Sequence, residues 1–407
     1  MIHHCAKIFA IVAYLVSAFS IRAGAQASLP STVSDGFGVC VHFTDPKPGE
    51  MKMLADSGAR WIRTDFYWDH VERTKGQYDF SEYDRLMAAL QQYNIHALLI
   101  LDYGNKLYDD GLAPHTDAGR QAFAQWAAAS AQHFQGRGII WEMWNEPQPD
   151  GFWRPKANVD DYIKLALAVG EAIRKSAPGE AYVGPATAGF PVSFLEPCFK
   201  AGLLNYWSAV SIHPYRRSIP ETAFIDYQNL SNLIAKYAPK GKQIPIIVSE
   251  WGYSTDWGLV GNEENQATLL ARALLTNAAA GIPLTVWYQW WGDGFALTKG
   301  AYSQGQDSVY QPRPSYVAAR NNASVLSGYR FDRFLLNNGS DYALQFRNGD
   351  KTLVAAWTMG NAHAATVPVN GRFRVVGTKG EALAVPPAGG RGASITLTQA
   401  PQHLVPQ

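Results

Sequence analysis

Short apolar runs recur between residues 36 and 327, and amphipathic segments separate them. Near-continuous apolar strands are typical of a parallel sheet that is covered on both faces. Eight such strands, each followed by a helix, predict an α/β protein with a closed (β/α)8 barrel, the TIM-barrel fold. The predicted strands cover residues 37–43, 60–68, 96–103, 139–146, 181–186, 208–215, 244–251 and 284–291.

The amphipathic segments carry apolar residues at intervals of three and four, the spacing of one helix face. Ser81 followed by Asp84 predicts a helix start, and two later helices are expected at residues 269–279 and 316–326. A doubly wound open sheet is the alternative, which the lack of a glycine-rich phosphate loop after the early strands disfavours. The expected apolar faces comprise Leu86, Met87, Leu90 and Tyr93 in one helix, and Tyr162, Leu165, Ala166, Val169 and Ile173 in another.

The chain after Ser327 has a different pattern, with apolar residues at every second position. The runs "YALQFRNGDKTLVAAWTMG", "ATVPVNGRFRVVG" and "SITLTQ" are separated by Asn-Gly, Gly and Pro signals, which are typical of antiparallel strands and hairpins. Residues 328–407 are therefore predicted to form a small antiparallel β-sandwich on the flank of the barrel, away from the active strand ends. We expect a structural role, because its aromatic residues Tyr342, Phe346, Trp357 and Phe373 alternate like core positions.

The first residues have the pattern of a secretory signal peptide. His3, His4 and Lys7 precede a short apolar run that closes with small residues, which predicts a signal peptide over residues 1–25 and a secreted or periplasmic protein. The catalytic barrel would then span residues 26–327. The apolar run is short for a membrane span, and no later stretch could serve as one. Cys40 and Cys198, which remain after cleavage, are expected to be buried thiols.

Charge and composition narrow the classes of partner. The 407 residues include 35 basic and 34 acidic ones, for a net charge of +1, so nothing favours nucleic acid or an anionic membrane surface. The 13 tryptophans and 20 tyrosines either fill a large core or form flat platforms for sugar rings. Motifs with metal-ligand spacing, phosphate loops and G-x-S-x-G are absent from the sequence, so we expect no metal and no cofactor. We also expect a monomer.

Two glutamates in the stretch "WEMWNEPQP" raise a question of chemistry. In a (β/α)8 barrel, function is located at the C-terminal ends of the strands. Glu142 lies in the middle of the fourth predicted strand, so we interpret it as a structural carboxylate paired with a basic group. Glu146 lies at the end of that strand, before Pro147, and would open onto the active face.

The expected partner of Glu146 is Glu250, at the end of the seventh predicted strand in "IIVSEWGYS". The two carboxylates would face one another across the barrel mouth. Paired carboxylates that flank an aromatic-lined pocket are what glycoside hydrolysis requires. One of them must hold a proton while the other stays ionised to attack the anomeric carbon.

The motifs "WNEP" and "SEWG" resemble those of the clan A glycoside hydrolases, whose barrels carry an Asn-Glu doublet after strand four and a nucleophilic Glu after strand seven. The stretch "WIRTDFYWDHVERTKGQYDF" resembles the second-strand arginine motif of that clan, and "SIHPY" its sixth-strand His and Tyr. The "NEP…FW" run with Trp153 and the β-rich tail are most similar to family 39, its biofilm-polysaccharide hydrolase relatives, and the cellulase-like family 5.

The resemblance implies a role for each matching residue. Trp290 is chosen, from three tryptophans at the eighth strand, as the floor of the sugar pocket, and Trp153 as a further substrate-binding residue. Asp102 with Tyr103 either contacts substrate or closes a loop. His42, His70 and His96 are expected to be packing or surface groups. The remaining roles are general acid/base for Glu146, nucleophile for Glu250, contact to the sugar 2-hydroxyl for Asn145, hydrogen bond to the nucleophile for Arg63, and polar contacts near the two glutamates for His213 and Tyr215.

The sequence therefore predicts a retaining glycoside hydrolase that cleaves a β-linked poly- or oligosaccharide by double displacement. One alternative is a non-catalytic carbohydrate-binding barrel, which would have no need of two opposed carboxylates. Another is a hydrolase of α-L-linked uronides, similar to the iduronidases, which additional basic residues in the pocket would favour.

Overall fold

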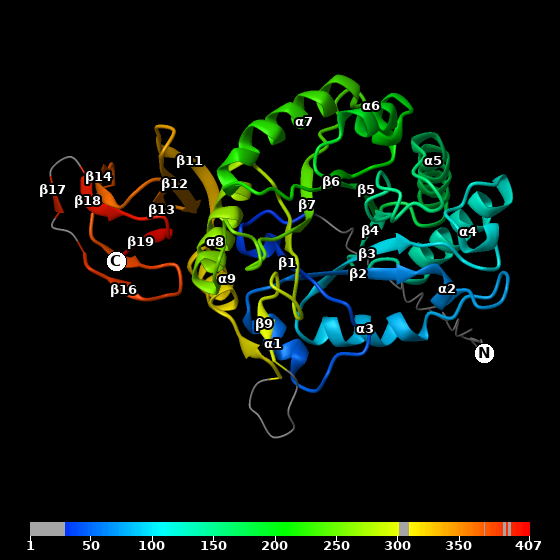
Figure 1. Cartoon of the computed structure of the whole chain (residues 1–407), viewed down its shortest axis with the longest axis horizontal. Helices are drawn as coiled ribbons and strands as arrows, with labels where there is room; N and C mark the ends of the chain where they lie inside the picture. Colours follow the sequence, from blue (N-terminus) through cyan, green and yellow to red (C-terminus); the bar gives the residue numbers. More distant parts are fainter. Residues whose placement is uncertain (1–28, 301–308, 370, 386–387, 390–391) are drawn as a thin grey trace, which may run out of the picture.

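The computed structural model describes residues 29–300, 309–369, 371–385, 388–389 and 392–407, so the predicted signal peptide lies outside the described residues. Eight parallel strands form a closed barrel in the order β1 to β8 (Figure 1). The TIM-barrel prediction is confirmed, and the open-sheet alternative is wrong. The barrel strands are β1 Phe37–Cys40, β2 Trp61–Tyr67, β3 His96–Asp102, β4 Ile140–Met143, β5 Ala181–Ala188, β6 Ala209–His213, β7 Ile246–Trp251 and β8 Thr285–Trp287.

Helices surround this barrel. The expected apolar face of α5 is buried throughout, but in α3 the prediction for Tyr93 is wrong, because α3 ends at Gln92 and Tyr93 is 36% exposed. The α-helices are α1 Glu50–Asp56, α2 Trp68–Val71, α3 Ser81–Gln92, α4 Asp117–His133, α5 Val159–Ser176, α6 Val192–Lys200, α7 Ala223–Tyr237, α8 Glu263–Ala279 and α9 Pro314–Val325. Short 3-10 helices occur at η1 Ser34–Gly36, η2 Asp109–Gly111, η3 Leu203–Asn205 and η4 Pro220–Thr222.

The strands bury both of their faces, as their apolar sequences indicate. In β3, Leu98 and Ile100 belong to the core inside the barrel, whereas Leu99 and Leu101 belong to the core between strands and helices. Side chains of a strand alternate between its two faces, so one apolar run supplies both cores. The interior is therefore filled with side chains, and the open space lies at the strand ends.

The residues after the barrel form two antiparallel sheets, drawn in orange and red beside α8 and α9 in Figure 1. Apolar residues of both sheets, among them Val354 and Ile395, share one core, so the β-sandwich prediction is confirmed. The six-stranded sheet has the order β11 Arg330–Asn337, β12 Asp341–Asn348, β13 Lys351–Thr358, β19 Gln402–Pro406, β15 Phe373–Val376 and β16 Ala382–Leu383. The three-stranded sheet has the order β14 His363–Val367, β18 Gly392–Leu397 and β17 Ala388–Gly389, and a separate pair is formed by β9 Thr298–Lys299 and β10 Gln311–Pro312.

The sandwich packs on the barrel through the outer face of its larger sheet. Tyr342, Phe346 and Trp357 are buried in a cluster that includes Leu275 of α8. Three of the four predicted aromatic core positions therefore face the barrel, while Phe373 packs between the two sheets. The prediction that these aromatics form a core rather than an exposed row is confirmed.

A buried ion pair reinforces this contact. Arg272 of α8 donates two hydrogen bonds of 2.7 Å to Glu221 of η4, and the Trp357 indole donates a third of 2.7 Å to the same carboxylate. Arg272 is 2% exposed and Glu221 is 5% exposed. The sandwich thus supplies a hydrogen-bond donor to a charge that the barrel buries.

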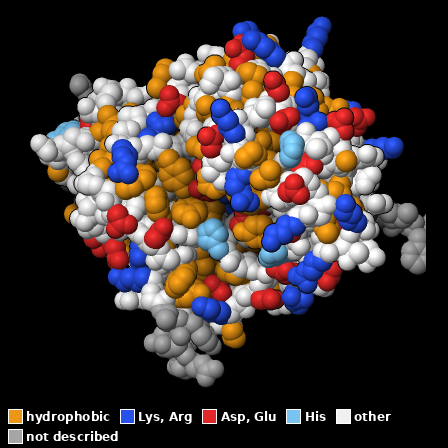
Figure 2. Space-filling view, turned by 45° about the vertical axis from the view of Figure 1, so that its right-hand side comes forward, with side chains coloured by type: hydrophobic (Ala, Val, Ile, Leu, Met, Phe, Trp, Pro, Cys, Tyr) orange, Lys and Arg blue, Asp and Glu red, His pale blue; other side chains and the backbone are white. Residues whose placement is uncertain are grey.

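The surface carries both signs of charge. Figure 2 shows Lys, Arg, Asp and Glu side chains interspersed over one face, with hydrophobic side chains gathered around a hollow near its middle. Cys40 and Cys198 are buried free thiols, as expected. Across the described ranges, none of the helices combines the length and the apolar character that a membrane span requires.

Candidate active site

Arg63 of β2 joins three polar residues at the C-terminal end of the barrel. Its Nε donates to Glu142 at 2.7 Å, its Nη1 to Glu250 at 2.8 Å and its Nη2 to Asn145 at 2.8 Å. Arg63 is 3% exposed and Glu142 fully buried. Burial lowers the pKa of Arg63, but the Glu142 and Glu250 charges outweigh that effect and raise it well above its usual range. The basic partner expected for Glu142 is therefore Arg63, which also contacts Glu250.

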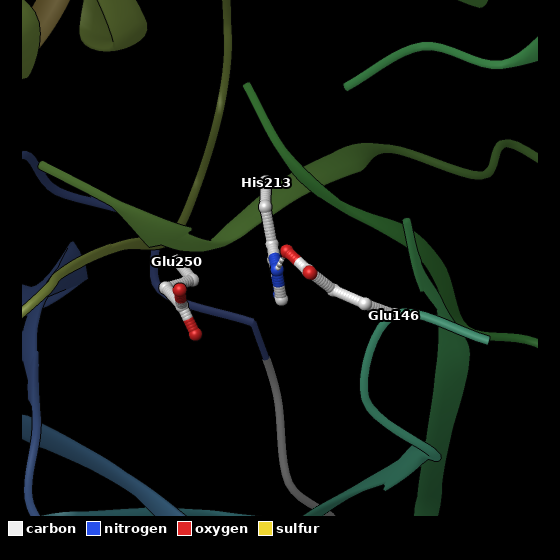
Figure 3. A group of neighbouring side chains, drawn as sticks. All are labelled: Glu146, His213 and Glu250. Atoms are coloured by element: carbon white, nitrogen blue, oxygen red, sulfur yellow. Dashed lines mark hydrogen bonds and ion pairs between the residues drawn. The ribbon is translucent and has the colours of Figure 1, made fainter. Parts of the chain in front are cut away.

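Glu146 is held beside His213 by an irregular segment after β4. The strand ends at Met143, three residues before the expected end at Glu146, because Trp144 and Glu146 adopt left-handed backbone angles, with φ of 65° and 46°. Such conformations are uncommon outside glycine and are concentrated at functional sites. The turn brings the Glu146 Oε1 atom within 2.8 Å of Nδ1 of His213, whose ring is fully buried (Figure 3).

Glu250 has different partners. Its Oε2 accepts the hydrogen bond from Arg63, and its Oε1 accepts one of 2.8 Å from the hydroxyl of Tyr215. Burial, followed by the charge of Glu250, raises the pKa of Tyr215 well above its usual range, so this phenol remains a donor. The contacts that the resemblance implied for Arg63, His213 and Tyr215 are therefore present.

The three groups drawn in Figure 3 lie close together at the mouth. A carboxylate oxygen of Glu146, one of Glu250 and a ring nitrogen of His213 are all within 4.8 Å of one another. Among the described residues this is the one group of acidic, His or Cys side chains with the geometry to hold a metal ion. The guanidinium of Arg63 already supplies a positive charge to Glu250 at 2.8 Å, which disfavours a second cation there.

A cavity of about 270 Å³ opens above Glu146, Glu250, Arg63 and Asn145. Several of its walls were not singled out as site residues from the sequence. They come from the ends of β1, β2 and β8 and from the loop after β4: His42, Asp65, Tyr67, Phe152 and Tyr288. Tyr103, which the sequence analysis considered as a substrate contact, also lines the cavity. His42 is exposed and its ring packs edge-on against Tyr288, as expected for a packing or surface group, and it also lines the cavity. The sequence signal that could have identified these wall residues is their location at or just after the C-terminal end of a predicted strand.

Two aromatic residues that the sequence placed in the site lie elsewhere. Trp290 is 2% exposed, and its indole donates to Glu50 at 3.0 Å beneath Tyr316, outside the cavity lining. The choice of Trp290 as the pocket floor is therefore wrong, and Tyr288 from the same run contributes to the wall instead. Trp153 is likewise 2% exposed and packs on Trp144, while its neighbour Phe152 faces the cavity.

Asp102, the last residue of β3, lies behind the cavity wall. It is fully buried, and no N–H or O–H group of the other described residues donates to its carboxyl oxygens, whose hydrogen-bonding neighbour is the Asp65 carboxyl group. Burial, followed by the negative charge of Asp65, raises its pKa well above the usual range. Of the two roles considered for Asp102, direct substrate contact is not supported by this position, since Tyr103 is the residue that lines the cavity.

Part of the second-strand motif is structural. The carboxylate of Glu72 accepts hydrogen bonds from the Trp68 indole at 2.6 Å, from the Gly76 amide at 2.7 Å and from the Tyr108 hydroxyl at 2.7 Å. Glu72 is 1% exposed. This network fixes the loop after β2, which explains why Trp and Glu follow the arginine without entering the site.

With this fold and site established, comparison with known proteins defines the class. Residues 32–294 match the sequence model of the family described as cellulase (glycosyl hydrolase family 5). The match spans more than half of the chain, so the protein belongs to this family of clan A and is a glycoside hydrolase. The predicted enzyme class is confirmed. No curated protein matches the chain significantly.

Solved structures share the architecture over nearly the whole chain. A family 39 glycoside hydrolase from Bacteroides cellulosilyticus WH2 has a TM-score of 0.79 and 24% identity, covering 93% of this chain and 83% of that one. A family 39 β-xylosidase from Caulobacter crescentus has a TM-score of 0.66 and 18% identity, with 94% and 98% coverage. A family 30 xylanase from Clostridium acetobutylicum has a TM-score of 0.65 and 14% identity, with 93% and 97% coverage. At these identities the likeness concerns the fold.

Proposed function

We propose that this protein is a retaining glycosidase that cleaves a β-linked poly- or oligosaccharide, with Glu250 as nucleophile and Glu146 as general acid/base. The observation that carries the proposal is the approach of the two carboxylates, with one oxygen of Glu146 and one of Glu250 within 4.8 Å of each other at the barrel mouth. Carboxyl groups of retaining enzymes lie about 5–5.5 Å apart, and those of inverting enzymes about 6.5–9.5 Å apart. The close approach leaves little room for a water molecule between them, which favours direct attack.

The different partners of the two glutamates support different roles in the first step. Hydrogen bonds from Arg63 and Tyr215 favour the charged form of Glu250, as a nucleophile requires. Glu146 contacts His213 and has no ion pair with Lys or Arg among the described residues, so it can hold the proton that the leaving oxygen needs. Glu250 attacks the anomeric carbon, the bond to the leaving oxygen breaks, and the proton of Glu146 passes to that oxygen.

The second step releases the sugar. Glu146, now ionised, takes a proton from a water molecule while the water oxygen attacks the anomeric carbon and the bond to Glu250 breaks. The His213 ring at 2.8 Å can stabilise Glu146 in this form by donating from Nδ1. Asn145, fixed by Arg63 at 2.8 Å, is placed to bind the sugar 2-hydroxyl, a contact that strengthens in the transition state. Two inversions give net retention.

The two alternatives find less support. A non-catalytic binding barrel has no use for a buried arginine that orders one of two opposed carboxylates. A site for uronides would need a cation for the sugar carboxylate, and Arg63 is the single Lys or Arg among the described cavity-lining residues. Three of its nitrogens already donate to Glu142, Glu250 and Asn145.

The experiment that tests the proposal is hydrolysis of a panel of polysaccharides and nitrophenyl glycosides, with the anomeric configuration of the first product read by NMR. We expect β-linked substrates to give a β-configured product before mutarotation. An initial α-product from a β-substrate would contradict the double displacement, and no turnover of any glycoside would contradict the proposal as a whole. We further expect an exported monomer, as a related β-xylosidase structure from Caulobacter crescentus CB15 is described as monomeric.

A further inference from the structure

Asp65 places a carboxylate in the cavity wall that the proposed mechanism does not use. It lies two residues after Arg63 on β2, so both side chains point to the same side of the strand. The side chain is partly buried and lines the same cavity as Glu146 and Glu250. No ion pair between Asp65 and a Lys or Arg occurs in the described part of the chain, where Arg63 is engaged with other partners. The Tyr67 hydroxyl and the Asp102 side chain form hydrogen bonds with Asp65. A carboxylate has about four acceptor positions, so Asp65 keeps others for a ligand.

A second acid, Asp102, stands behind Asp65. Residues 65 and 67 of β2 are in register with residues 100 and 102 of β3. Asp102 is fully buried, and among the described residues only the Asp65 side chain lies within hydrogen-bonding reach of its carboxyl group. A buried carboxylate without donors or a cation is costly. Burial and the Asp65 charge raise the pKa of Asp102 well above its usual range. A neutral Asp102 has an O–H that can donate to Asp65 and orient it.

We propose, on the basis of the function proposed above, that Asp65, oriented by Asp102, is a specificity-determining residue that accepts hydrogen bonds from the hydroxyls of an uncharged sugar at the cleavage position. Asp65, Glu146 and Glu250 make this wall rich in acceptors, which matches hydroxyl donors. A uronic acid would bring its own carboxylate against them, and like charges across an interface are strongly disfavoured. Arg154 lines only a neighbouring cavity that shares Tyr103 and Phe152 with this one.

The test compares kcat/KM for neutral nitrophenyl β-glycosides and for the β-glucuronide in wild type and in Asp65→Asn. Wild type should prefer the best neutral glycoside at least 100-fold. Loss of a charged acceptor in Asp65→Asn should lower kcat/KM for that glycoside about 10- to 100-fold. It should therefore also lower the ratio of kcat/KM for the neutral glycoside to kcat/KM for the β-glucuronide. Asp69→Asn, at an exposed position outside the cavity lining, is the matched control and should change neither quantity.

The role of Asp102 is tested by the ratio of kcat/KM for the neutral glycoside to kcat/KM for the β-glucuronide, measured in two Asp102 variants. Asp102→Asn keeps a neutral hydrogen-bond donor to Asp65 and should keep the wild-type ratio. Asp102→Leu removes that donor and should lower the ratio. A preference that stays within twofold of wild type in Asp65→Asn would overturn the inference while leaving hydrolysis intact. Saturation-transfer NMR of the same glycosides gives a binding readout. If wild type hydrolysed none of the glycosides, the proposed function would fail. Equal binding of the neutral glycoside to wild type and to Asp65→Asn would separately overturn the role of Asp65.

Discussion

The Nη1 atom of Arg63 donates a 2.8 Å hydrogen bond to Oε2 of Glu250, and so joins β2 to the end of β7. The guanidinium reaches across the barrel interior, where it also meets the fully buried Glu142 at 2.7 Å. One cation therefore satisfies a structural carboxylate and the proposed nucleophile together. Loss of Arg63 should lower stability through the unpaired Glu142 and lower catalysis through Glu250.

Arg63→Met should lower the free energy of unfolding by about 3–5 kcal/mol, because it leaves Glu142 charged and unpaired in the interior. Adding Glu142→Gln removes that charge and should restore part of the stability, but not the activity, since Glu250 still lacks its donor. Urea unfolding and kcat/KM measure the two effects. Arg85→Met is the control, because the pair of Arg85 with Asp45 is solvent-exposed, and exposed ion pairs contribute little to stability. An equal loss of unfolding free energy in Arg63→Met and Arg85→Met would contradict this account.

Glu146→Ala should impair natural glycosides far more than nitrophenyl glycosides, because a good leaving group needs no proton. With the activated substrate, the glycosyl-enzyme should accumulate for lack of a base. Azide, which is small enough to enter the vacated space, should partly restore turnover. NMR should identify a β-glycosyl azide from a β-substrate. An α-azide in this variant would assign Glu146 to the other role.

Glu250→Ala should abolish the normal reaction of both substrate types, because no glycosyl-enzyme can form. Azide can then attack the anomeric carbon directly, with Glu146 still present as acid, and the product should be the α-glycosyl azide. Turnover with and without azide, together with product stereochemistry, checks this expectation. Near-normal turnover of Glu250→Ala would require another carboxylate as nucleophile.

Trp357→Phe should lower the free energy of unfolding by about 1.5–3 kcal/mol, the contribution of one hydrogen bond to a charged group, with kcat/KM unchanged. The lost bond is the one to the buried Glu221 of the barrel. Trp291→Phe, at a side chain that is 46% exposed, should cost less. Truncation after Ser327 should destabilise the barrel, because it uncovers the apolar cluster around Leu275. A truncated chain that is stable and fully active would show the β-sandwich to be dispensable.

His403 should make the protein sensitive to mild acid. It is buried in β19 with neither ring nitrogen hydrogen-bonded within the described residues, and burial lowers its pKa to about 4. The unfolded chain therefore binds the proton first, so stability from this residue is complete above about pH 6.5 and falls by about 3 kcal/mol as the pH drops toward 4.

His403→Leu should remove that component, which urea unfolding at several pH values measures as the difference from wild type. His363→Asn is the control. His363 is exposed, and its hydrogen bonds to the Asn361 carbonyl and to Asp341 raise its pKa. Its contribution to stability is therefore present at low pH and lost as the pH rises, the opposite of the contribution of His403. An unchanged pH dependence in His403→Leu would contradict the assignment to His403.

Much of the polar site follows from residue order. Glu146, Glu250, His213 and Tyr215 follow apolar strands closely, and the C-terminal ends of parallel strands meet at one end of a barrel. The hydrogen bonds at 2.8 Å to the two glutamates agree with that expectation. The roles of these residues in catalysis remain predictions.

The aromatic walls did not follow in the same way. The run "VWYQWWGDG" contains four large rings, and composition alone does not distinguish the ring that meets substrate from those that fill the core. Trp287 and Trp290 are buried, whereas Tyr288 lines the cavity. The strand ends at Trp287, and beyond that residue the direction of each side chain depends on loop packing.

The sequence by itself determined the barrel, the β-sandwich and the location of both glutamates on the C-terminal side of the barrel. Hydrophobic periodicity and chain order are local properties, and the parallel barrel arranges the strands so that their C-terminal ends meet. Only the tertiary structure decided that Arg63 serves Glu142 and Glu250 together, that Asp102 stands behind Asp65, and that Tyr288 rather than Trp290 faces the cavity. The first two relationships join side chains of different strands inside the barrel, and the third depends on the loop after β8. Each brings together segments far apart in the chain, which no local pattern encodes.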